Sequence, residues 1–414
     1  MPPVEELARR SRVAAATVAT LPTQTKNACL RGLAERIETQ AARIRQANAS
    51  DVAESRDAGL GDAKLRRLTL SDEAIQQMAD GLRQVAELDD PVGAVTKHYQ
   101  APSGLDVRKV RCPLGVIMMI YEARPNVTVD AFALCFKAGN ACILKGGREA
   151  SLSNRVLAEL AVEALEAHDV MADAITLLTS SDREEMKCLL HLDQYIDLVI
   201  PRGGAELIRF VHENSHIPTV QHFHGVCHIF VDSSAELDRA IDICMTAKTS
   251  APATCNATEC VLVHEAITPE FLPRLMGRLN EAGVEVRGDP TVCSLAPQAI
   301  HATDDDWGRE FLDLILAIKV VPDIEAAIEH INTHGSNHTD AILSTDECNQ
   351  RRFVDHVQSS CTLVNASTRF NDGFQLGLGA EIGISTSKIH AYGPMGLEEL
   401  TAQRYIVQGA WQVR

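Results

Sequence analysis

Residues 116–147 read VIMMIYEARPNVTVDAFALCFKAGNACILKGG, and this stretch decides the fold class. Two short apolar runs, 116–121 and 141–145, have the length of buried strands and flank a longer apolar segment, 127–138, that is typical of a helix. Gly139 stands where a helix commonly ends. A strand, a helix and a second strand in this order predict a parallel, doubly wound α/β sheet.

The same alternation continues along the chain. Further strands are predicted at 174–178 and 196–200, with helices at 150–167 and 183–190. A second set has predicted strands at 228–231, 260–263, 284–287, 314–321, 341–343 and 362–365, with helices such as 235–247 and 324–331 between them. Two α/β halves in tandem predict a ligand-binding cleft between domains.

Different patterns precede and follow these halves. The first ninety residues predict helices, as at 75–85, where apolar residues recur at helical spacing and Ser71 is placed as a cap. Residues 95–111 alternate in character and are divided by Gly104, which predicts a β-hairpin. The last thirty residues are rich in polar side chains and close on a short extended piece, 404–407.

Composition narrows the class of protein. The 414 residues are 45% hydrophobic and 23% charged, the balance of a soluble globular chain with two or three domains. A net charge of −17 without any basic block argues against nucleic acid as a partner. No apolar run is long enough to cross a membrane, and no secretory signal is present. Twelve cysteines without a C-x-x-C pair predict reduced thiols in a cytoplasmic protein, rather than disulfides or a metal site.

Cys255 lies in SAPATCNATECVLVHE, residues 250–265, among small and polar residues just ahead of a predicted strand. One interpretation is an ordinary buried cysteine. The other is a nucleophile whose approach has to stay clear of bulky groups. The neighbouring residues leave both interpretations open.

Lys145, Gly146 and Gly147 stand at the carboxyl end of a predicted strand and ahead of a predicted helix. In a doubly wound sheet this position faces the crevice where nucleotides bind, and an ammonium group there suits ribose hydroxyls or a phosphate. A lysine on a solvated turn accounts for the same residues equally well. The sequence has no G-x-G-x-x-G loop.

Glu122, Arg124 and Asn126 come directly after the predicted strand 116–121. A guanidinium at the carboxyl edge of a strand suits a carboxylate or a phosphate. Glu122 either binds an ammonium group or pairs with Arg124, and Asn126 alternatively caps the following helix. Together the three residues predict a site that recognises a small zwitterionic molecule.

Arg369 closes the last predicted strand of the second half, in NASTRF, residues 365–370. The glycine-rich loop 373–383 follows and carries Glu381. A functional loop and a well-packed structural loop are both consistent with this composition.

Several motifs closely resemble those of the gamma-glutamyl phosphate reductase family, a branch of the aldehyde dehydrogenase superfamily. The resemblance extends in one order from the helical start to the carboxyl terminus. The matching motifs are VRCPLGVI (110–117), YEARPNVT (121–128), PATCNATE (252–259), VNASTRF (364–370), GLGAEIGIST (377–386) and GPMGLEEL (393–400).

The resemblance implies two doubly wound α/β domains of the aldehyde dehydrogenase type and a small β oligomerisation arm. Residues 1–93 and 113–227 would form an NADP-binding domain with amino-terminal helices, and 228–366 a catalytic domain that carries Cys255. Residues 94–112 and 385–414 would form the arm, and 367–384 an active-site loop that returns to the cofactor domain.

The resemblance also implies roles for single residues. Cys255 is similar to the superfamily's nucleophile, Lys145 to the lysine at the adenosine ribose, and Glu310 to the glutamate at the nicotinamide ribose. The family's substrate is L-glutamyl 5-phosphate and its reductant is NADPH, in the second step of proline synthesis from glutamate. The backbone N–H of Cys255, with the amide of Asn256 or Asn126, is our expected oxyanion donor. A homo-oligomer is expected, and a glutamate kinase is a possible partner.

Two departures from family patterns bear on function. Oxidising aldehyde dehydrogenases carry a hydrolytic glutamate where this chain has VQHFHG, residues 220–225, without a carboxylate. This favours reduction of an acyl phosphate over oxidation of an aldehyde. Tyr392 stands where the reductases are expected to have an arginine, which puts one phosphate contact in doubt. A hydrolytic aldehyde dehydrogenase and a non-enzymatic binding protein remain the alternatives.

Overall fold

The computed structural model describes residues 4–180, 182–221 and 223–413, which fall into two units. Unit 1 comprises the residues up to 221 together with 378–383 and 395–414. Unit 2 comprises 222–377 and 384–394, and is therefore an insertion into unit 1. The prediction drew the boundary between the halves at 227 and assigned all of 385–414 to the arm.

Unit 1 contains a four-stranded parallel sheet with the order β5-β4-β3-β6. All six residues of β3 are buried, as expected for a strand covered by helices on both faces. One face packs on α1 and α8, and α6 contacts the sheet as well. The strands are β3 (Val116–Tyr121), β4 (Ala141–Lys145), β5 (Ile175–Leu177) and β6 (Leu198–Arg202).

The helices of unit 1 begin and end where the sequence supplies caps and breakers. Ser71 accepts a hydrogen bond from the backbone N–H of Ala74, which confirms the predicted cap. Gly139 has φ +82° just after α6, which confirms the predicted stop. The helices are α1 (Val4–Val18), α2 (Thr23–Thr39), α3 (Ala41–Asp57), α4 (Asp62–Leu68), α5 (Asp72–Glu87), α6 (Asn126–Lys137), α7 (Ser151–Glu166), α8 (Arg183–Leu190) and α9 (Ala205–Asn214).

Unit 2 contains a seven-stranded parallel sheet with the order β10-β9-β11-β8-β7-β12-β13. Residues of α10 and α11 cover one face, and residues of α13 and α14 cover the other. The strands are β7 (Cys227–Val231), β8 (Thr258–His264), β9 (Glu285–Gly288), β10 (Ile300–His301), β11 (Ile315–Val321), β12 (Thr339–Leu343) and β13 (Cys361–Val364), and the helices are α10 (Leu237–Thr249), α11 (Thr268–Glu281), α12 (Pro290–Leu295), α13 (Ile324–His334) and α14 (Glu347–His356). The predicted pair of doubly wound α/β sheets is confirmed.

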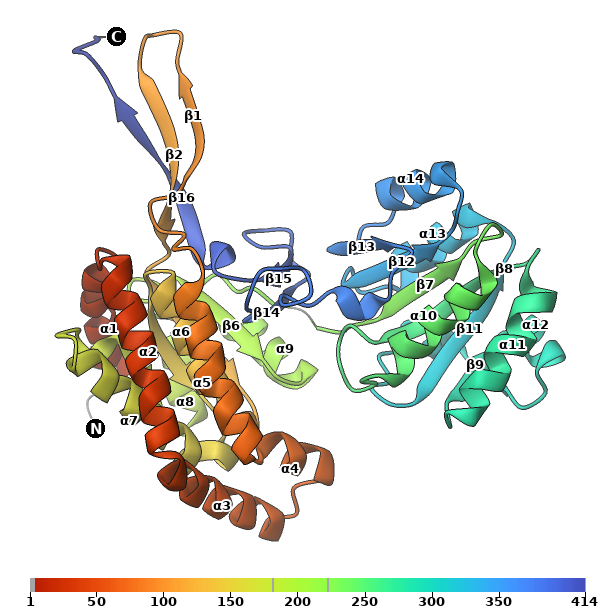
Figure 1. Ribbon diagram of the computed structural model, residues 1–414, viewed down its shortest axis with the longest axis horizontal. Coiled ribbons are helices and arrows are strands. Elements are labelled where there is room, and N and C mark those ends of the chain that lie inside the picture. The colour runs from red at the N-terminus through yellow and green to blue at the C-terminus, as the bar shows by residue number, and fades with distance from the viewer. Residues whose placement is uncertain (1–3, 181, 222, 414) are drawn as a thin grey trace. The chain divides into compact units, whose positions relative to one another are not determined.

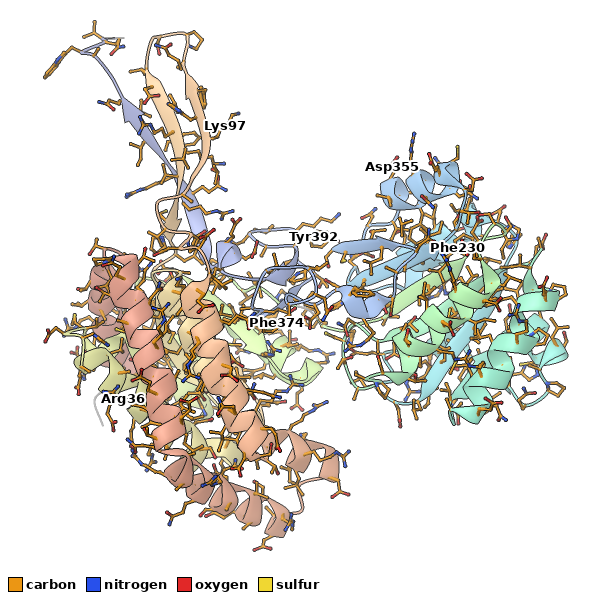
Figure 2. The ribbon with its side chains drawn as sticks, viewed as in Figure 1. Arg36, Lys97, Phe230, Asp355, Phe374 and Tyr392 are labelled. Atoms are coloured by element: carbon orange, nitrogen blue, oxygen red, sulfur yellow. The ribbon has the colours of Figure 1, made fainter. Side chains whose placement is uncertain are left out.

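A three-stranded antiparallel sheet forms an arm that belongs to unit 1 (Figure 1). It consists of β1 (Val95–Gln100), β2 (Asp106–Pro113) and β16 (Thr401–Gln408), with β2 in the middle. The predicted hairpin at 95–111 is confirmed. Side chains project outward from the arm, among them Lys97 on β1 (Figure 2). All residues of β1 are exposed.

Two further strands lie where the chain passes between the units. β14 (Gly383–Ser385) and β15 (Gly393–Met395) form a two-stranded sheet. Short 3₁₀ turns include η1 (Arg148–Ala150) and η4 (Thr368–Phe370). Among the described residues, no helix combines the length and the apolar character needed to cross a membrane.

Candidate active site

Unit 1 has a cavity of about 240 Å³ at the carboxyl end of β4. Lys145, Gly146 and Gly147 line it, so three of the predicted site residues lie together. The remaining lining residues are Arg148, Ser151, Asn154, Leu177, Leu178 and Thr179. A nucleotide site is expected at such an edge of a doubly wound sheet.

The two glycines leave this cavity open. A Cβ at Gly146 would overlap the side-chain amide of Asn154, and a Cβ at Gly147 would overlap the carboxylate of Glu149. That carboxylate accepts a hydrogen bond from the backbone N–H of Ala123 at 2.6 Å and is not part of the lining. The charged side chains of the lining are therefore both cationic, Lys145 and Arg148.

Lys145 is half-buried, and its Nζ donates to the carbonyl of Gly146 at 3.0 Å. Burial lowers the pKa of its ammonium group, and the nearby Glu149 opposes that shift. A second cavity of about 400 Å³ shares Leu177 and Thr179 with the first. It lies against α7 and β5, and aliphatic side chains form one part of its lining while Arg155, Glu159 and Glu163 form another.

The other predicted residues of unit 1 lie on loops near the carboxyl ends of β3 and β6. The carboxylate of Glu122 is exposed and accepts from the backbone N–H of Gly204 at 3.2 Å. Arg124 is half-buried on the loop between β3 and α6. Glu381 is half-buried and precedes Ile382, whose carbonyl accepts from the guanidinium of Arg202 at the end of β6. None of the three lines the cavity at Lys145.

Asn126 does not cap α6, so that interpretation is wrong. Pro125 occupies the cap position, and Asn126 is the first helical residue. Its side-chain amide donates to the Asp130 carboxylate at 3.0 Å. Burial raises the pKa of Asp130 to about 6, against the opposing effects of Asn126 and Arg202.

In unit 2, Cys255 is half-buried on the loop that leads into the amino end of β8. The residues before and after Cys255 are each held by a hydrogen bond. The guanidinium of Arg369 donates to the Thr254 hydroxyl at 2.8 Å. The Asn256 amide donates to the carbonyl of Asn371 at 3.0 Å. The structure thus brings together three predicted residues, Cys255, Asn256 and Arg369.

The carbonyl group of Cys255 is enclosed by a second loop. A Cβ at Gly225 would overlap its oxygen, so only glycine allows this approach. The thiol of Cys227 donates to the same oxygen at 3.2 Å. Burial raises the pKa of Cys227, which keeps it protonated as a donor. These contacts place Gly225, the last residue of the stretch 220–225, beside Cys255. His222 of that stretch lies outside the described residues.

Glu310 is linked to the Cys255 loop through a hydrogen bond with Gly225. Its carboxylate accepts from the backbone N–H of Gly225 at 2.9 Å, and only 14% of its side chain is exposed. Burial raises the pKa of Glu310, and the bond from Gly225 and the charge of His224 oppose the shift. The half-exposed His224 lies 3.9 Å away, measured from Nδ1 to a carboxylate oxygen.

Tyr392, at the position expected to hold arginine, donates its hydroxyl to the carbonyl of Gln358 (Figure 2). Lys388 lies 5.8 Å from the centre of its ring. A cation therefore lies close to this position although it is not an arginine.

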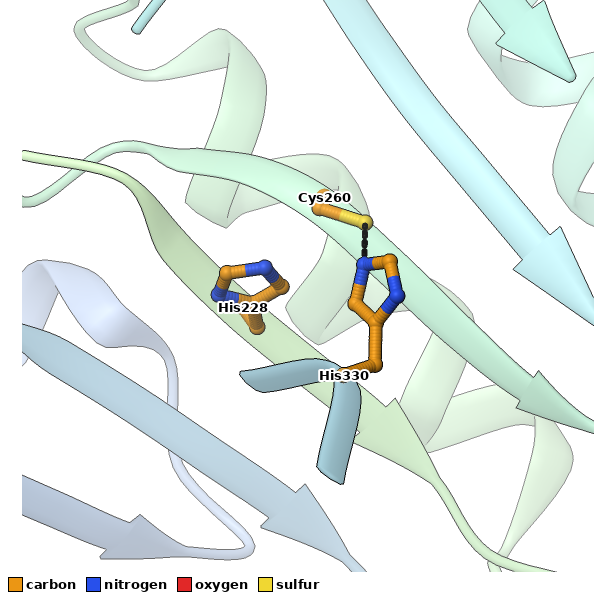
Figure 3. A group of neighbouring side chains, drawn as sticks. All are labelled: His228, Cys260 and His330. Atoms are coloured by element: carbon orange, nitrogen blue, oxygen red, sulfur yellow. Dashed lines mark hydrogen bonds between the residues drawn. The ribbon is translucent and has the colours of Figure 1, made fainter. Parts of the chain in front are cut away.

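His228, Cys260 and His330 form a buried group in unit 2, with ligand-type atoms within 4.8 Å of one another (Figure 3). The Asp340 carboxylate lies 2.9 Å from Nδ1 of His228, an arrangement that metal-binding histidines often have. However, the ammonium group of Lys319 lies 3.2 Å from Nδ1 of His330. This leaves the proton of His330 on Nε2, which faces Cys260. Because Lys319 would repel a bound cation, the charges around this group oppose a metal.

Sequence reasoning missed several of these residues. Arg148 follows a strand, as Arg124 and Arg369 do, and Arg202 is the last residue of β6. The predicted strand 196–200 stopped two residues before Arg202. Cys227 is one of twelve cysteines, and nothing in the sequence marks it out. Its role follows only from the contact with Cys255.

Comparisons with known proteins show the family to which the chain is similar. Residues 3–305 match the model of the aldehyde dehydrogenase family. The chain is 50% identical over 411 residues to a gamma-glutamyl phosphate reductase from Desulforapulum autotrophicum, with 99% of this chain and 98% of that protein covered. The crystal structure of gamma-glutamyl phosphate reductase from Thermotoga maritima matches with a TM-score of 0.97 and 41% identity over 100% of both chains. An engineered glycolyl-CoA reductase with bound NADP+ shares the fold, with a TM-score of 0.70, 15% identity, and 98% of this chain and 96% of that one covered.

Proposed function

The chain belongs to the aldehyde dehydrogenase family and, within it, to the gamma-glutamyl phosphate reductases, and from this premise we propose how its residues act. The reaction is the reduction of L-glutamyl 5-phosphate to L-glutamate 5-semialdehyde and phosphate, in proline biosynthesis. Cys255 is the nucleophile. The observation that carries this assignment is the fixed Cys255 loop, held by Arg369, Asn256, Cys227 and Gly225.

The thiolate of Cys255 attacks the acyl carbon, the bond from that carbon to the phosphate oxygen breaks, and a thioester remains on the enzyme. A bound reduced nicotinamide supplies a hydride. The resulting thiohemiacetal on Cys255 then collapses, the carbon–sulfur bond breaks, and the semialdehyde leaves. The backbone N–H of Cys255, with the amide of Asn256 or Asn126, stabilises the negative oxygen that develops in these steps.

Charged residues select the substrate. Arg369 is bonded to the residue next to Cys255, and its guanidinium suits a phosphate or a carboxylate. Arg124, Glu122 and Glu381 complete the recognition of a substrate with both an ammonium group and a carboxylate. Lys388 beside Tyr392 supplies the positive charge expected from an arginine.

The reductant is NADPH. Lys145 and Arg148 give the first cavity two cations without a carboxylate in its lining, which suits a ribose that carries an additional phosphate. The aliphatic part of the second cavity suits the adenine ring. Glu310 holds the hydroxyl groups of the nicotinamide ribose. Together these features fit NADPH better than NADH.

The stretch 220–225 supports reduction rather than hydrolysis. Gly225 touches the carbonyl group of Cys255, so this stretch is where a hydrolytic base would act. Its described side chains include no carboxylate. Water therefore lacks the carboxylate base that hydrolytic aldehyde dehydrogenases carry in this stretch.

The experiment is the reverse reaction with purified enzyme, NADP+ and L-glutamate 5-semialdehyde. We expect NADPH to form only when inorganic phosphate is added, with a rate that rises and saturates with phosphate concentration. Turnover without phosphate would contradict the proposal and favour a hydrolytic aldehyde dehydrogenase. A protein that bound no nicotinamide nucleotide would favour a non-enzymatic role.

The proposal includes the setting of the enzyme. Tyr99, Tyr405 and Val407 are large exposed side chains of the arm, whose edge strands suit pairing with a second copy in a homo-oligomer. The twelve cysteines, all within the described residues, form no disulfides, in keeping with a cytoplasmic location. Because an acyl phosphate hydrolyses readily, a glutamate kinase that hands it over directly is a fitting partner.

A further inference from the structure

Lys248 and Glu259 form an ion pair in the interior of unit 2. Their Nζ and Oε2 atoms lie 2.6 Å apart, and the two side chains are 0% and 1% exposed. Lys248 lies in the last turn of α10, and Glu259 is the second residue of β8 (Figure 1). Burying two charges costs free energy that their attraction only partly offsets, so stability alone does not account for the pair.

The second oxygen of Glu259 reaches a different loop. It accepts a hydrogen bond from the backbone N–H of Leu312 at 3.2 Å. Leu312 has φ +55°, a left-handed conformation that a leucine holds only when its surroundings enforce it. Glu310 lies two residues earlier on the same loop. Glu259 therefore fixes the segment that carries Glu310.

These contacts connect the loops that carry Cys255, Glu310 and Gly225. Cys255 is four residues ahead of Glu259, which binds the loop of Glu310. Glu310 accepts from Gly225, and Gly225 lies against the carbonyl group of Cys255. The loops that carry Gly225, Cys255 and Glu310 all precede strands of one sheet, β7, β8 and β11. A shift of one loop therefore moves the others.

The charges of the pair depend on each other. Burial raises the pKa of Glu259 to about 7 and lowers the pKa of Lys248, while the attraction between the two groups opposes both shifts. An ionised carboxylate accepts a backbone N–H more strongly than a neutral acid does. Lys248 thus keeps Glu259 in the state that holds Leu312 best.

We propose that Lys248 and Glu259 are positioning residues that hold the Glu310 loop and the Cys255 loop in one rigid frame. The inference rests on the proposed function for the roles of Cys255 and Glu310. It assigns neither Lys248 nor Glu259 a contact with substrate or cofactor. It predicts that loss of the acceptor for Leu312 weakens the use of NADPH and also changes the reactivity of Cys255.

The test compares two double variants, Lys248→Met/Glu259→Gln and Lys248→Met/Glu259→Leu. Both replace the ion pair by neutral side chains of similar size, so neither leaves an unpaired buried charge. Glutamine keeps an oxygen that can accept from the N–H of Leu312, together with its own amide N–H groups, whereas leucine has no polar atom. Lys26→Met is the control for lost stability, since it breaks the buried Lys26–Asp90 pair of unit 1.

The measurements are the KM for NADPH, the rate of alkylation of Cys255 by iodoacetamide without cofactor, and the melting temperature. For the leucine variant we expect about a tenfold higher KM and about a tenfold change in alkylation rate, with the glutamine variant within about threefold of wild type. Equal behaviour of the two double variants would overturn the proposal. So would the same changes in Lys26→Met at a matched loss of melting temperature.

The outcomes separate this inference from the proposed function. If wild-type protein shows no phosphate-dependent turnover, the proposed function fails. The alkylation rate of Cys255 and hydrogen exchange at residues 309–313 still test whether Glu259 couples the two loops. Unchanged exchange at 309–313 in the leucine variant would contradict the coupling.

Discussion

In unit 1 the predicted cofactor residues lie at the carboxyl end of β4, whereas in unit 2 Cys255 lies ahead of the amino end of β8. The unit 1 site consists of two glycines and two cations around an open cavity, with few side-chain bonds. The unit 2 site consists of loops that bind one another through side chains and backbone. Parallel sheets present ligand sites at their carboxyl edges, so the first arrangement needs little support. The unit 2 site lies at the amino edge of its sheet, where tertiary contacts between loops have to hold the site residues in place.

The test with the largest expected effect replaces the proposed nucleophile, Cys255→Ser. We expect turnover to fall at least about 1000-fold, because a serine hydroxyl is a far weaker nucleophile here. Affinity for NADPH should stay within about twofold, since the cavity at Lys145 belongs to unit 1 and is unchanged. Fluorescence titration of NADPH and the phosphate-dependent assay measure the two quantities. An equal loss of both would mean that the two sites are not separable.

A backbone change in unit 2 tests how rigid its frame has to be. In Gly225→Ala, the new Cβ would overlap the carbonyl oxygen of Cys255 and displace the loop. We expect kcat/KM to fall about 100-fold, as small displacements of reacting groups commonly cause. Gly277→Ala is the matched control in the same unit, because its Cβ meets nothing within 4 Å and lies within helix α11. Comparable activity of the two variants would contradict the close approach at Gly225.

A charge reversal in unit 1 tests the cavity itself. Arg148→Glu replaces one of the two cations in the lining by a carboxylate. We expect the KM for NADPH to rise about tenfold, because a phosphate would then face a negative charge. The KM for NADH should change by less than about twofold, and it serves as the internal control. Equal effects on both nucleotides would show that Arg148 does not select the phosphate.

The smallest effect concerns helix α6, which begins at Asn126 and contains Asp130. Asp130 has a pKa of about 6, above its ordinary value of 3.8, because its carboxyl is buried. Its contribution to stability is therefore present below pH 3.8 and lost as pH rises through 6. Asp130→Asn should raise the melting temperature at pH 8 by about 2 °C and leave it unchanged at pH 3.5. Thermal unfolding at the two pH values measures this, and a pH-independent difference would contradict it.

Much of the fold could be predicted, because buried parallel strands leave short apolar runs in the sequence. β3, β4 and α8 have the predicted bounds, and the hairpin at Gly104 and the cap at Ser71 are confirmed. The cap at Asn126 was wrong because the adjacent Pro125 takes the cap position. A local sequence pattern predicts the position of a helix or strand more reliably than it predicts the residue at which that element begins or ends.

The site could be predicted only in part. Residues 145–147 belong to one strand and its turn, so local sequence reveals them. The contacts among Gly225, Cys255 and Glu310 join loops far apart in sequence, and no local pattern records such a pairing. Lys248 and Glu259 are ordinary charged residues until the fold buries them together. The part of the site that could not be predicted from the sequence is the part that depends on tertiary contacts.

The insertion of unit 2 into unit 1 has a consequence for synthesis on the ribosome. Strand β2 is synthesised early, but its partner β16 is translated only after all residues of unit 2. Until then one edge of β2, the middle strand of the arm, is unpaired. The seven-stranded sheet of unit 2 can form in that interval, since its sequence is contiguous up to β13. A chain that ended between residues 395 and 400 would have a complete unit 2 but an exposed edge on β2, which favours aggregation.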